Sequence, residues 1–116
     1  MKIFITGVAG FLGSHLADLM ISQGHTVAGN DNMIGGYFDN VPQDVEFHQV
    51  DCCDLENMTK AMEGCDIVYH TAATAYEGLS VFSPVLVTRN IFEASVTTIT
   101  AAIRNKVKRI VYCSSM

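Results

Sequence analysis

Three glycines spaced three residues apart follow the first apolar segment of the chain, in the stretch TGVAGFLG that begins at Thr6. Residues 2–6 have the length and apolar character of a buried strand, and residues 11–23 carry apolar side chains at helical spacing. Glycines at such a strand-to-helix turn permit a tight bend, close approach of backbone amides to a pyrophosphate, and close packing of helix on strand. A glycine triplet alone can be a packing turn, but here a strand precedes it and a helix follows. The motif therefore predicts a dinucleotide-binding unit, with these residues at the cofactor: Gly7, Gly10, Phe11, Leu12 and Gly13.

The rest of the chain continues this alternation of strands and helices. Apolar runs predict further strands at residues 25–29, 45–50, 66–70 and 108–113. Helices are expected at 55–62, with Asp54 as the N-cap, and from near Pro84 to about Asn105, whereas 32–44 has the composition of a loop. Such alternation is typical of βαβ units, which give a parallel sheet with right-handed crossovers. The predicted fold class is α/β, a Rossmann-like doubly wound sheet with strand order 3-2-1-4-5, in one domain over residues 1–116.

Composition excludes several classes of protein. With 49% hydrophobic and 16% charged residues, the chain has the composition of a folded protein, and no apolar run approaches the roughly 20 residues of a membrane span. A net charge of −5 argues against nucleic-acid binding. No signal peptide is evident, so a cytoplasmic location is expected, with the four cysteines reduced and no metal site, since no C-x-x-C spacing occurs.

Acidic residues stand at the expected carboxyl ends of the second and third strands. Asp31 lies 18 residues after Gly13, where a carboxylate can accept both hydroxyls of an adenosine ribose, with Asn32 beside it. A carboxylate there repels a 2′-phosphate, and no arginine occurs between residues 3 and 88, so NAD is favoured over NADP. Asp51, followed by Cys52, is either a contact to the adenine edge or an ordinary turn acid.

These motifs, in this order, resemble the first part of the extended short-chain dehydrogenases/reductases, in the NAD-dependent epimerase/dehydratase family. The resemblance covers the whole chain. Its motifs are TGVAGFLGSHL, the acid of NDN, DCCDL, YHTAA, the S-V-F-S-P of residues 80–84, and VKRIVYCSS. The family's substrates are nucleotide sugars, so a UDP-sugar is the implied partner and a homodimer a possible assembly.

The resemblance also implies roles for residues beyond the glycine turn. Three small residues after the fourth strand are implied to line the cofactor: Thr71, Ala72 and Ala73. Asn90 matches an asparagine near the nicotinamide half in several relatives, but Glu93-Ala94-Ser95 replaces their x-Gly-Thr, so a helix-surface asparagine stays an alternative. Ser115 matches the serine of the family's Ser-Tyr-Lys catalytic set, which binds the reacting oxygen of the substrate. His70 is interpreted as a packed core histidine.

The tyrosine and lysine of that set, spaced Tyr-x-x-x-Lys, do not occur in the sequence. The residues four positions after the tyrosines are Val41, Ala73, Ser80 and Met116. The first hypothesis is therefore the N-terminal, NAD-binding part of a nucleotide-sugar epimerase or dehydratase, without turnover by itself and with an open sheet edge that favours self-association. A stand-alone dinucleotide-binding module and an NADP-dependent ketone reductase of the same superfamily are the alternatives.

Overall fold

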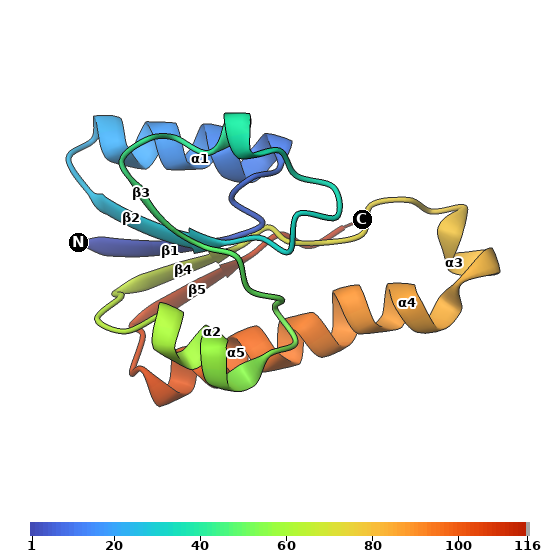
Figure 1. Cartoon of the computed structure of the whole chain (residues 1–116). Coiled ribbons are helices and arrows are strands. Elements are labelled where there is room, and N and C mark those ends of the chain that lie inside the picture. The colour runs from blue at the N-terminus through green and yellow to red at the C-terminus, as the bar shows by residue number, and fades with distance from the viewer. Residues whose placement is uncertain (116) are drawn as a thin grey trace.

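Five parallel strands pair in the order β3-β2-β1-β4-β5, as the sequence predicted. The computed structural model describes residues 1–115. Its strands are β1 (Lys2–Thr6), β2 (Thr26–Asn30), β3 (Val45–His48), β4 (Ile67–His70) and β5 (Arg109–Tyr112). Figure 1 shows all five carboxyl ends at the same edge of the sheet. This carboxyl edge is where open α/β sheets bind ligands.

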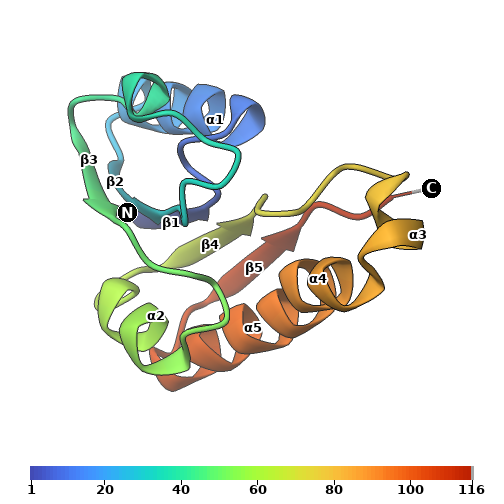
Figure 2. The same ribbon diagram turned by 45° about the vertical axis from the view of Figure 1, so that its right-hand side comes forward.

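Helices cover both faces of the sheet (Figures 1 and 2). α1 (Phe11–Ser22) lies on one face, together with the short 3₁₀ helix η1 (Phe38–Asn40). α2 (Leu55–Ala61) and α5 (Ala94–Arg104) lie on the other. The predicted N-cap of α2 is confirmed, because the Asp54 carboxylate accepts a hydrogen bond from the Asn57 amide.

Side-chain alternation along the central strands produces two apolar cores. Ile3 and Ile5 of β1 face α1 and contact a cluster that includes Ala17. Phe4, between them, points to the other face, where it joins a cluster with Met58 of α2. Successive residues of a strand point to opposite faces, so a strand buried on both sides reads as a continuous apolar run. This geometry explains why the segment IFI shows no polar alternation.

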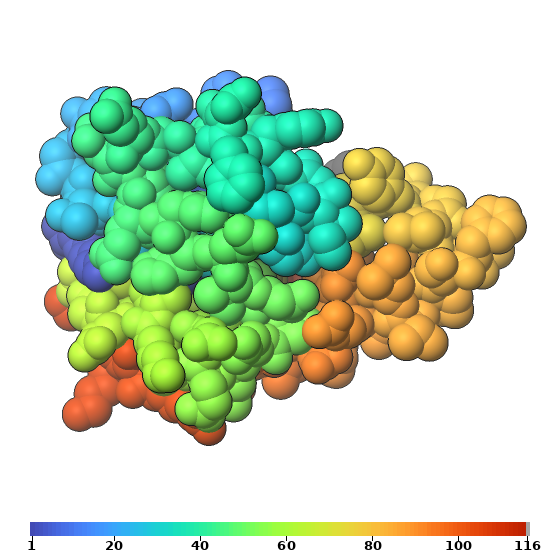
Figure 3. All heavy atoms as spheres, in the orientation of Figure 1, coloured from blue at the N-terminus to red at the C-terminus, as the bar shows by residue number. Residues whose placement is uncertain are grey.

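The long helical segment between β4 and β5 differs in detail from the prediction. It begins earlier, with α3 (Leu79–Phe82), and continues after Ser83 as α4 (Pro84–Thr88), the π-helical turn η2 (Arg89–Glu93) and α5. Ser83 has φ −141° and ψ 62°, which separates α3 from α4, and Pro84 then occupies the first turn of α4. α3 and α4 project past the carboxyl edge, as the yellow and orange residues of Figure 3 show.

Smaller differences concern the bounds and the content of predicted segments. β2, β4 and β5 lie at 26–30, 67–70 and 109–112, where the prediction was 25–29, 66–70 and 108–113. β3 stops at His48 rather than Val50, because the Val50 amide donates to the His48 carbonyl, 3.0 Å away, and the chain turns out of the sheet. The predicted loop 32–44 contains η1. In the part of the chain that the structure describes, no helix has the length and apolar character needed to cross a membrane.

Candidate functional site

The glycine turn between β1 and α1 has no room for side chains at two of its three glycines. Gly7 has φ +69°, and a Cβ added there would lie 2.9 Å from Cα of Ala72. A Cβ at Gly13 would lie only 2.2 Å from the Gly7 carbonyl oxygen. At Gly10 the corresponding contact is 3.2 Å, so crowding by the chain itself is milder there. The first and third glycines are therefore required by the packing of the turn itself.

The start of α1 presents unused hydrogen-bond donors at the carboxyl edge. The amides of Phe11, Leu12 and Gly13 donate to no acceptor among residues 1–115, whereas the next amide, of Ser14, donates to Gly10. First-turn amides have no partner inside a helix, and together with the helix dipole they favour an anion. Phe11 and Leu12 are exposed beside them. This end of α1 suits a pyrophosphate.

Asp31 is buried directly beside the glycine turn. Its Oδ2 accepts a hydrogen bond from the Ala9 amide at 3.1 Å, and its Oδ1 accepts one from the Met33 amide at 2.9 Å. Each carboxylate oxygen keeps a second lone pair for a ribose hydroxyl. Asn32, the other residue predicted here, is half-buried, and its Oδ1 accepts from the Ile34 amide at 3.1 Å. The sequence predicted neither of the Asp31 contacts.

Asp51 and Cys52, beyond the end of β3, point in different directions. Oδ1 of Asp51 accepts from the Cys53 amide at 2.8 Å, and its Oδ2 lies 3.9 Å from Nη2 of Arg89. Cys52 is buried, its thiol 3.3 Å from Nδ2 of Asn30, and burial raises the pKa of this thiol. Burial, followed by the Asp51 carboxylate, also raises the pKa of Cys53 to about 11. Both thiols therefore stay protonated near neutral pH, and the Cys52 side chain belongs to the core.

A cleft of about 200 Å³ lies beyond the ends of β4 and β5. It brings together four predicted site residues, namely Thr71, Ala72, Ala73 and Ser115. The other residues that line it are His70, Ile91, Ser95, Tyr112, Cys113 and Ser114. Asn90 does not line the cleft, and its Nδ2 donates to Oγ1 of Thr74 at 3.0 Å. The structure thus places Asn90 against the segment after β4, one residue away from the cleft lining.

The end of β4 is tied to the end of β1 through a hydroxyl that sequence reasoning did not single out. Oγ1 of Thr6 accepts hydrogen bonds from the amides of Thr71 and Ala72, both at 3.1 Å. It also lies 2.8 Å from Nδ1 of His70. Because the two amides occupy its acceptor positions, the single hydroxyl proton goes to Nδ1. Nδ1 of His70 is therefore an acceptor, and the neutral ring carries its proton on Nε2.

The other side of the His70 ring reaches α5. Nε2 lies 3.0 Å from Oγ of Ser95, whose hydroxyl donates to the Ile91 carbonyl at 2.5 Å. The ring stacks on Tyr112 of β5, with a centroid distance of 5.6 Å. Burial lowers the pKa of His70, which keeps the ring neutral at pH 7. The prediction of a packed core histidine is confirmed, with a bridging position between β1, β4 and α5.

These features together fit an extended dinucleotide along the carboxyl edge. Free amides at α1 suit its pyrophosphate, the Asp31 carboxylate suits the ribose hydroxyls at one end, and the cleft beyond β4 and β5 lies towards the other. Among residues 1–115 no three His, Cys, Asp or Glu side chains gather in a way that could hold a metal ion.

Comparison with known proteins also points to a dinucleotide-binding chain. The profile of the NAD dependent epimerase/dehydratase family matches residues 3–116. GDP-mannose 3,5-epimerase of Arabidopsis thaliana is 34% identical over 116 residues, covering 99% of this chain and 31% of the relative.

Two solved structures superpose on almost the whole chain. UDP-glucose 4-epimerase of Thermotoga maritima with UDP-glucose gives a TM-score of 0.96 at 30% identity, covering 99% of this chain and 38% of that one. The Thermus thermophilus UDP-glucose 4-epimerase complex with NAD gives 0.94 at 33% identity, with the same coverages. The chain thus spans about a third of the length of these relatives. The match over nearly every residue shows that the chain belongs to the NAD-dependent epimerase/dehydratase family, whose cofactor is NAD.

Proposed function

We propose that the chain is the NAD-binding part of a nucleotide-sugar epimerase or dehydratase that acts by transient hydride transfer at a sugar carbon. The observation that carries this proposal is the pair formed by the free first-turn amides of α1 and the buried Asp31 carboxylate at one sheet edge. The first suits a pyrophosphate and the second a ribose without a 2′-phosphate. The UDP-glucose in the Thermotoga maritima structure supports a UDP-sugar as the substrate.

The proposed roles divide along the carboxyl edge. Bound NAD supplies a reversible hydride acceptor. The backbone after β4, held by Oγ1 of Thr6, presents small side chains against which the dinucleotide lies. Ser115, in the cleft, donates a hydrogen bond to the reacting oxygen of the sugar. No tyrosine of the chain has a lysine four positions later, so the proposal assigns the proton transfer to no residue of these 116 and expects no turnover from them alone.

Calorimetric titration with NAD and NADP tests this proposal. The wild-type chain should bind NAD more tightly than NADP, because the Asp31 carboxylate repels a 2′-phosphate. Asp31→Asn removes that charge. The variant should bind NAD less tightly and NADP more tightly than the wild type, so the difference between the two affinities should become smaller. Asp44→Asn removes an exposed acid of the same loop and is the control, with the preference unchanged. Tighter binding of NADP by the wild type would contradict the role given to Asp31.

Self-association and a cytoplasmic setting complete the proposal. β5 pairs only with β4 among the described residues, and α5 exposes Val96, Ile99 and Ile103. An open strand edge next to exposed apolar side chains favours contact with a second copy. Light scattering should therefore give a mass above the 12.6 kDa of one chain, whereas a stable monomer would contradict this part. The four cysteines are free thiols, the form kept in a reducing compartment.

A further inference from the structure

The peptide groups of Ala9, in the middle of the glycine turn, are held from both sides by the segment that follows β2. The Ala9 amide donates to Oδ2 of Asp31 at 3.1 Å. The Ala9 carbonyl accepts two hydrogen bonds, from the Tyr37 amide and from Nδ2 of Asn40, each at 3.1 Å. Ala9 itself is fully buried. Residues 31–40, which we name the ribose loop, therefore form a clamp on this one residue.

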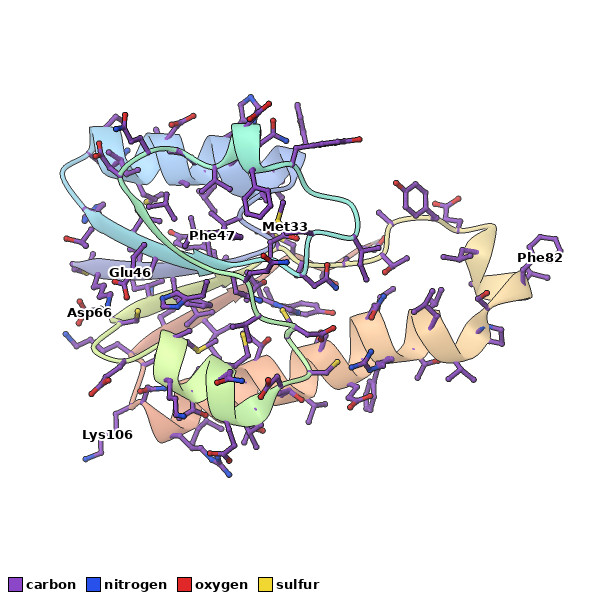
Figure 4. The ribbon with its side chains drawn as sticks, viewed as in Figure 1. Met33, Glu46, Phe47, Asp66, Phe82 and Lys106 are labelled. Carbon is purple, nitrogen blue, oxygen red and sulfur yellow. The ribbon has the colours of Figure 1, made fainter. Side chains whose placement is uncertain are left out.

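Close packing accompanies these hydrogen bonds. A Cβ added at Gly36 would lie 2.8 Å from Cβ of Ala9 and 3.1 Å from its carbonyl oxygen, so the loop backbone rests directly on the turn. Figures 1 and 2 show η1, which contains Asn40, beside α1. Figure 4 marks Met33, which anchors the start of the loop through Asp31, near the carboxyl ends of the strands. The ribose loop is thus fixed at its start by Asp31 and at its end by Asn40.

The clamp acts on the peptide group that leads into the first turn of α1. Ala9 precedes Gly10, the N-cap of α1, and the Gly13 amide makes no bond to the Ala9 carbonyl. The first turn of α1 therefore does not bond this carbonyl. The planar peptide group between Ala9 and Gly10 is held on its N–H side by the Gly7 carbonyl, 3.0 Å from the Gly10 nitrogen, and on its C=O side by the ribose loop. The Tyr37 donor is a backbone amide, which leaves the Asn40 amide as the side-chain donor in the clamp.

We infer that Asn40 is a positioning residue for the pyrophosphate of NAD, although it contacts no part of the cofactor itself. By holding the Ala9 carbonyl, Asn40 keeps the amides of Phe11, Leu12 and Gly13 aimed at the phosphates. This inference rests on the proposed binding of NAD at the glycine turn. Through Ala9, the ribose loop thus connects the part of the site proposed for the ribose with the part proposed for the pyrophosphate.

Titration of Asn40→Ala with NAD, ADP and adenosine tests the inference. A net hydrogen bond is equivalent to a several-fold change in a binding constant, so the Kd for NAD and for ADP should rise roughly three- to tenfold. The Kd for adenosine, which lacks phosphates, should stay within about twofold of the wild type, which is below the smallest rise expected for NAD and ADP. Asn40→Asp keeps the shape of the side chain but offers no N–H at pH 7, and it should show the same selective loss.

Asn105→Ala is the matched control. The Asn105 side chain also donates to backbone carbonyls, of Thr59 at 2.8 Å and Ala101 at 3.0 Å, but it lies between α2 and α5. This variant should lower the melting temperature and leave the Kd for NAD unchanged. If Asn40→Ala lowers the melting temperature while the Kd for NAD and ADP stays at the wild-type value, the inference is wrong and Asn40 only stabilises the fold. A wild-type chain that binds no NAD would overturn the proposed function as well.

Discussion

At the scale of single residues, the tightest steric requirement is at Gly13. An added Cβ would lie 2.2 Å from the Gly7 carbonyl oxygen and 3.0 Å from Cα of Val8, both backbone atoms that cannot rotate away. Alanine in place of glycine usually stabilises a helix by about 1 kcal/mol. Here Gly13→Ala should instead lower the free energy of unfolding by roughly 1–3 kcal/mol, the usual cost of overpacking. Denaturant unfolding monitored by circular dichroism measures this change.

Gly35→Ala is the control for that experiment. No atom lies within 4 Å of a Cβ added at Gly35, so its replacement should be neutral or slightly stabilising. If the two variants unfold at the same denaturant concentration, the close contact between α1 and the turn does not exist as described.

His70 gives the stability a defined pH dependence. Its folded-state pKa is lowered by burial, so below about pH 6.5, the usual value for histidine, the unfolded chain binds more protons than the folded one. The stabilising effect of a neutral His70 is thus complete above that pH and is lost as the pH falls below it. The melting temperature should therefore be lower at pH 5 than at pH 7.

Two variants separate His70 from other titrating groups. His70→Asn retains an acceptor for Thr6 but cannot titrate, so the variant should be less stable at pH 7 and show a flatter dependence between pH 7 and pH 5. His25→Asn removes a half-buried histidine at the amino end of β2 and should leave the dependence in place. If the melting temperature of His70→Asn falls between pH 7 and pH 5 as much as that of the wild type, groups other than His70 cause the loss of stability at low pH.

The residue scale is also where sequence reasoning succeeded least. The spacing of glycines and the position of Asp31 depend on local turn geometry, which the sequence pattern carries directly. The clamp by Asn40 depends on the path of a loop, and no periodic pattern marks a side chain whose partner is a backbone carbonyl 31 residues away. The contact between the side chains of His70 and Ser95 joins residues 25 positions apart and follows no periodic pattern either.

At the scale of elements, α5 depends on tertiary contacts more than on helix propensity. It contains the stretch Thr97-Thr98-Ile99-Thr100, which forms helix poorly, and its buried residues pack towards α2 and the sheet. Oγ1 of Thr98 is buried and makes no hydrogen bond of good geometry within residues 1–115, although the Cys52 thiol, a weak hydrogen-bonding group, lies beside it. A buried hydroxyl without a partner is destabilising.

Thr98→Val therefore should stabilise the chain. Valine keeps the branched shape and removes the buried hydroxyl, so the free energy of unfolding should rise by about 0.5–1.5 kcal/mol. Thr100→Val is the comparison, because the Thr100 hydroxyl donates to the Val96 carbonyl at 2.8 Å on an exposed surface, and its loss should be close to neutral. Chemical denaturation measures the free energy of unfolding of both variants. A destabilised Thr98→Val would mean that the hydroxyl has a partner.

Elements were predicted well where apolar periodicity defines them and less well where local backbone geometry does. The long helix was expected from Pro84, a residue suited to a first turn. α3 precedes it because the chain forms a separate turn at Leu79–Phe82 before Ser83 changes direction. The π turn of η2 follows no sequence pattern, since it differs from an α-helix by one backbone hydrogen-bond step.

At the scale of the whole molecule, the strand order follows from the alternation of strands and helices. Right-handed crossovers between parallel strands leave few ways to arrange five strands with helices on both faces. The order then forces the ends of β1, β2 and β4 together, and with them the glycine turn, Asp31 and Thr71. The alternation of elements therefore predicted that the glycine turn, Asp31 and Thr71 lie at one edge, whereas it did not predict that the Cys52 side chain lies in the core or that Asn90 lies outside the cleft lining.

The most direct test of this account is the map of backbone amide chemical shifts during titration with NAD. Amides of Phe11, Leu12, Gly13 and the segments 31–33 and 71–73 should shift, because they surround the proposed cofactor path. Glu63 and Lys106 lie at the opposite end of the sheet, where Figure 4 labels Lys106, and their amides should stay in place. Shifts confined to that opposite end, or no shifts at saturating NAD, would contradict a dinucleotide site at the carboxyl edge.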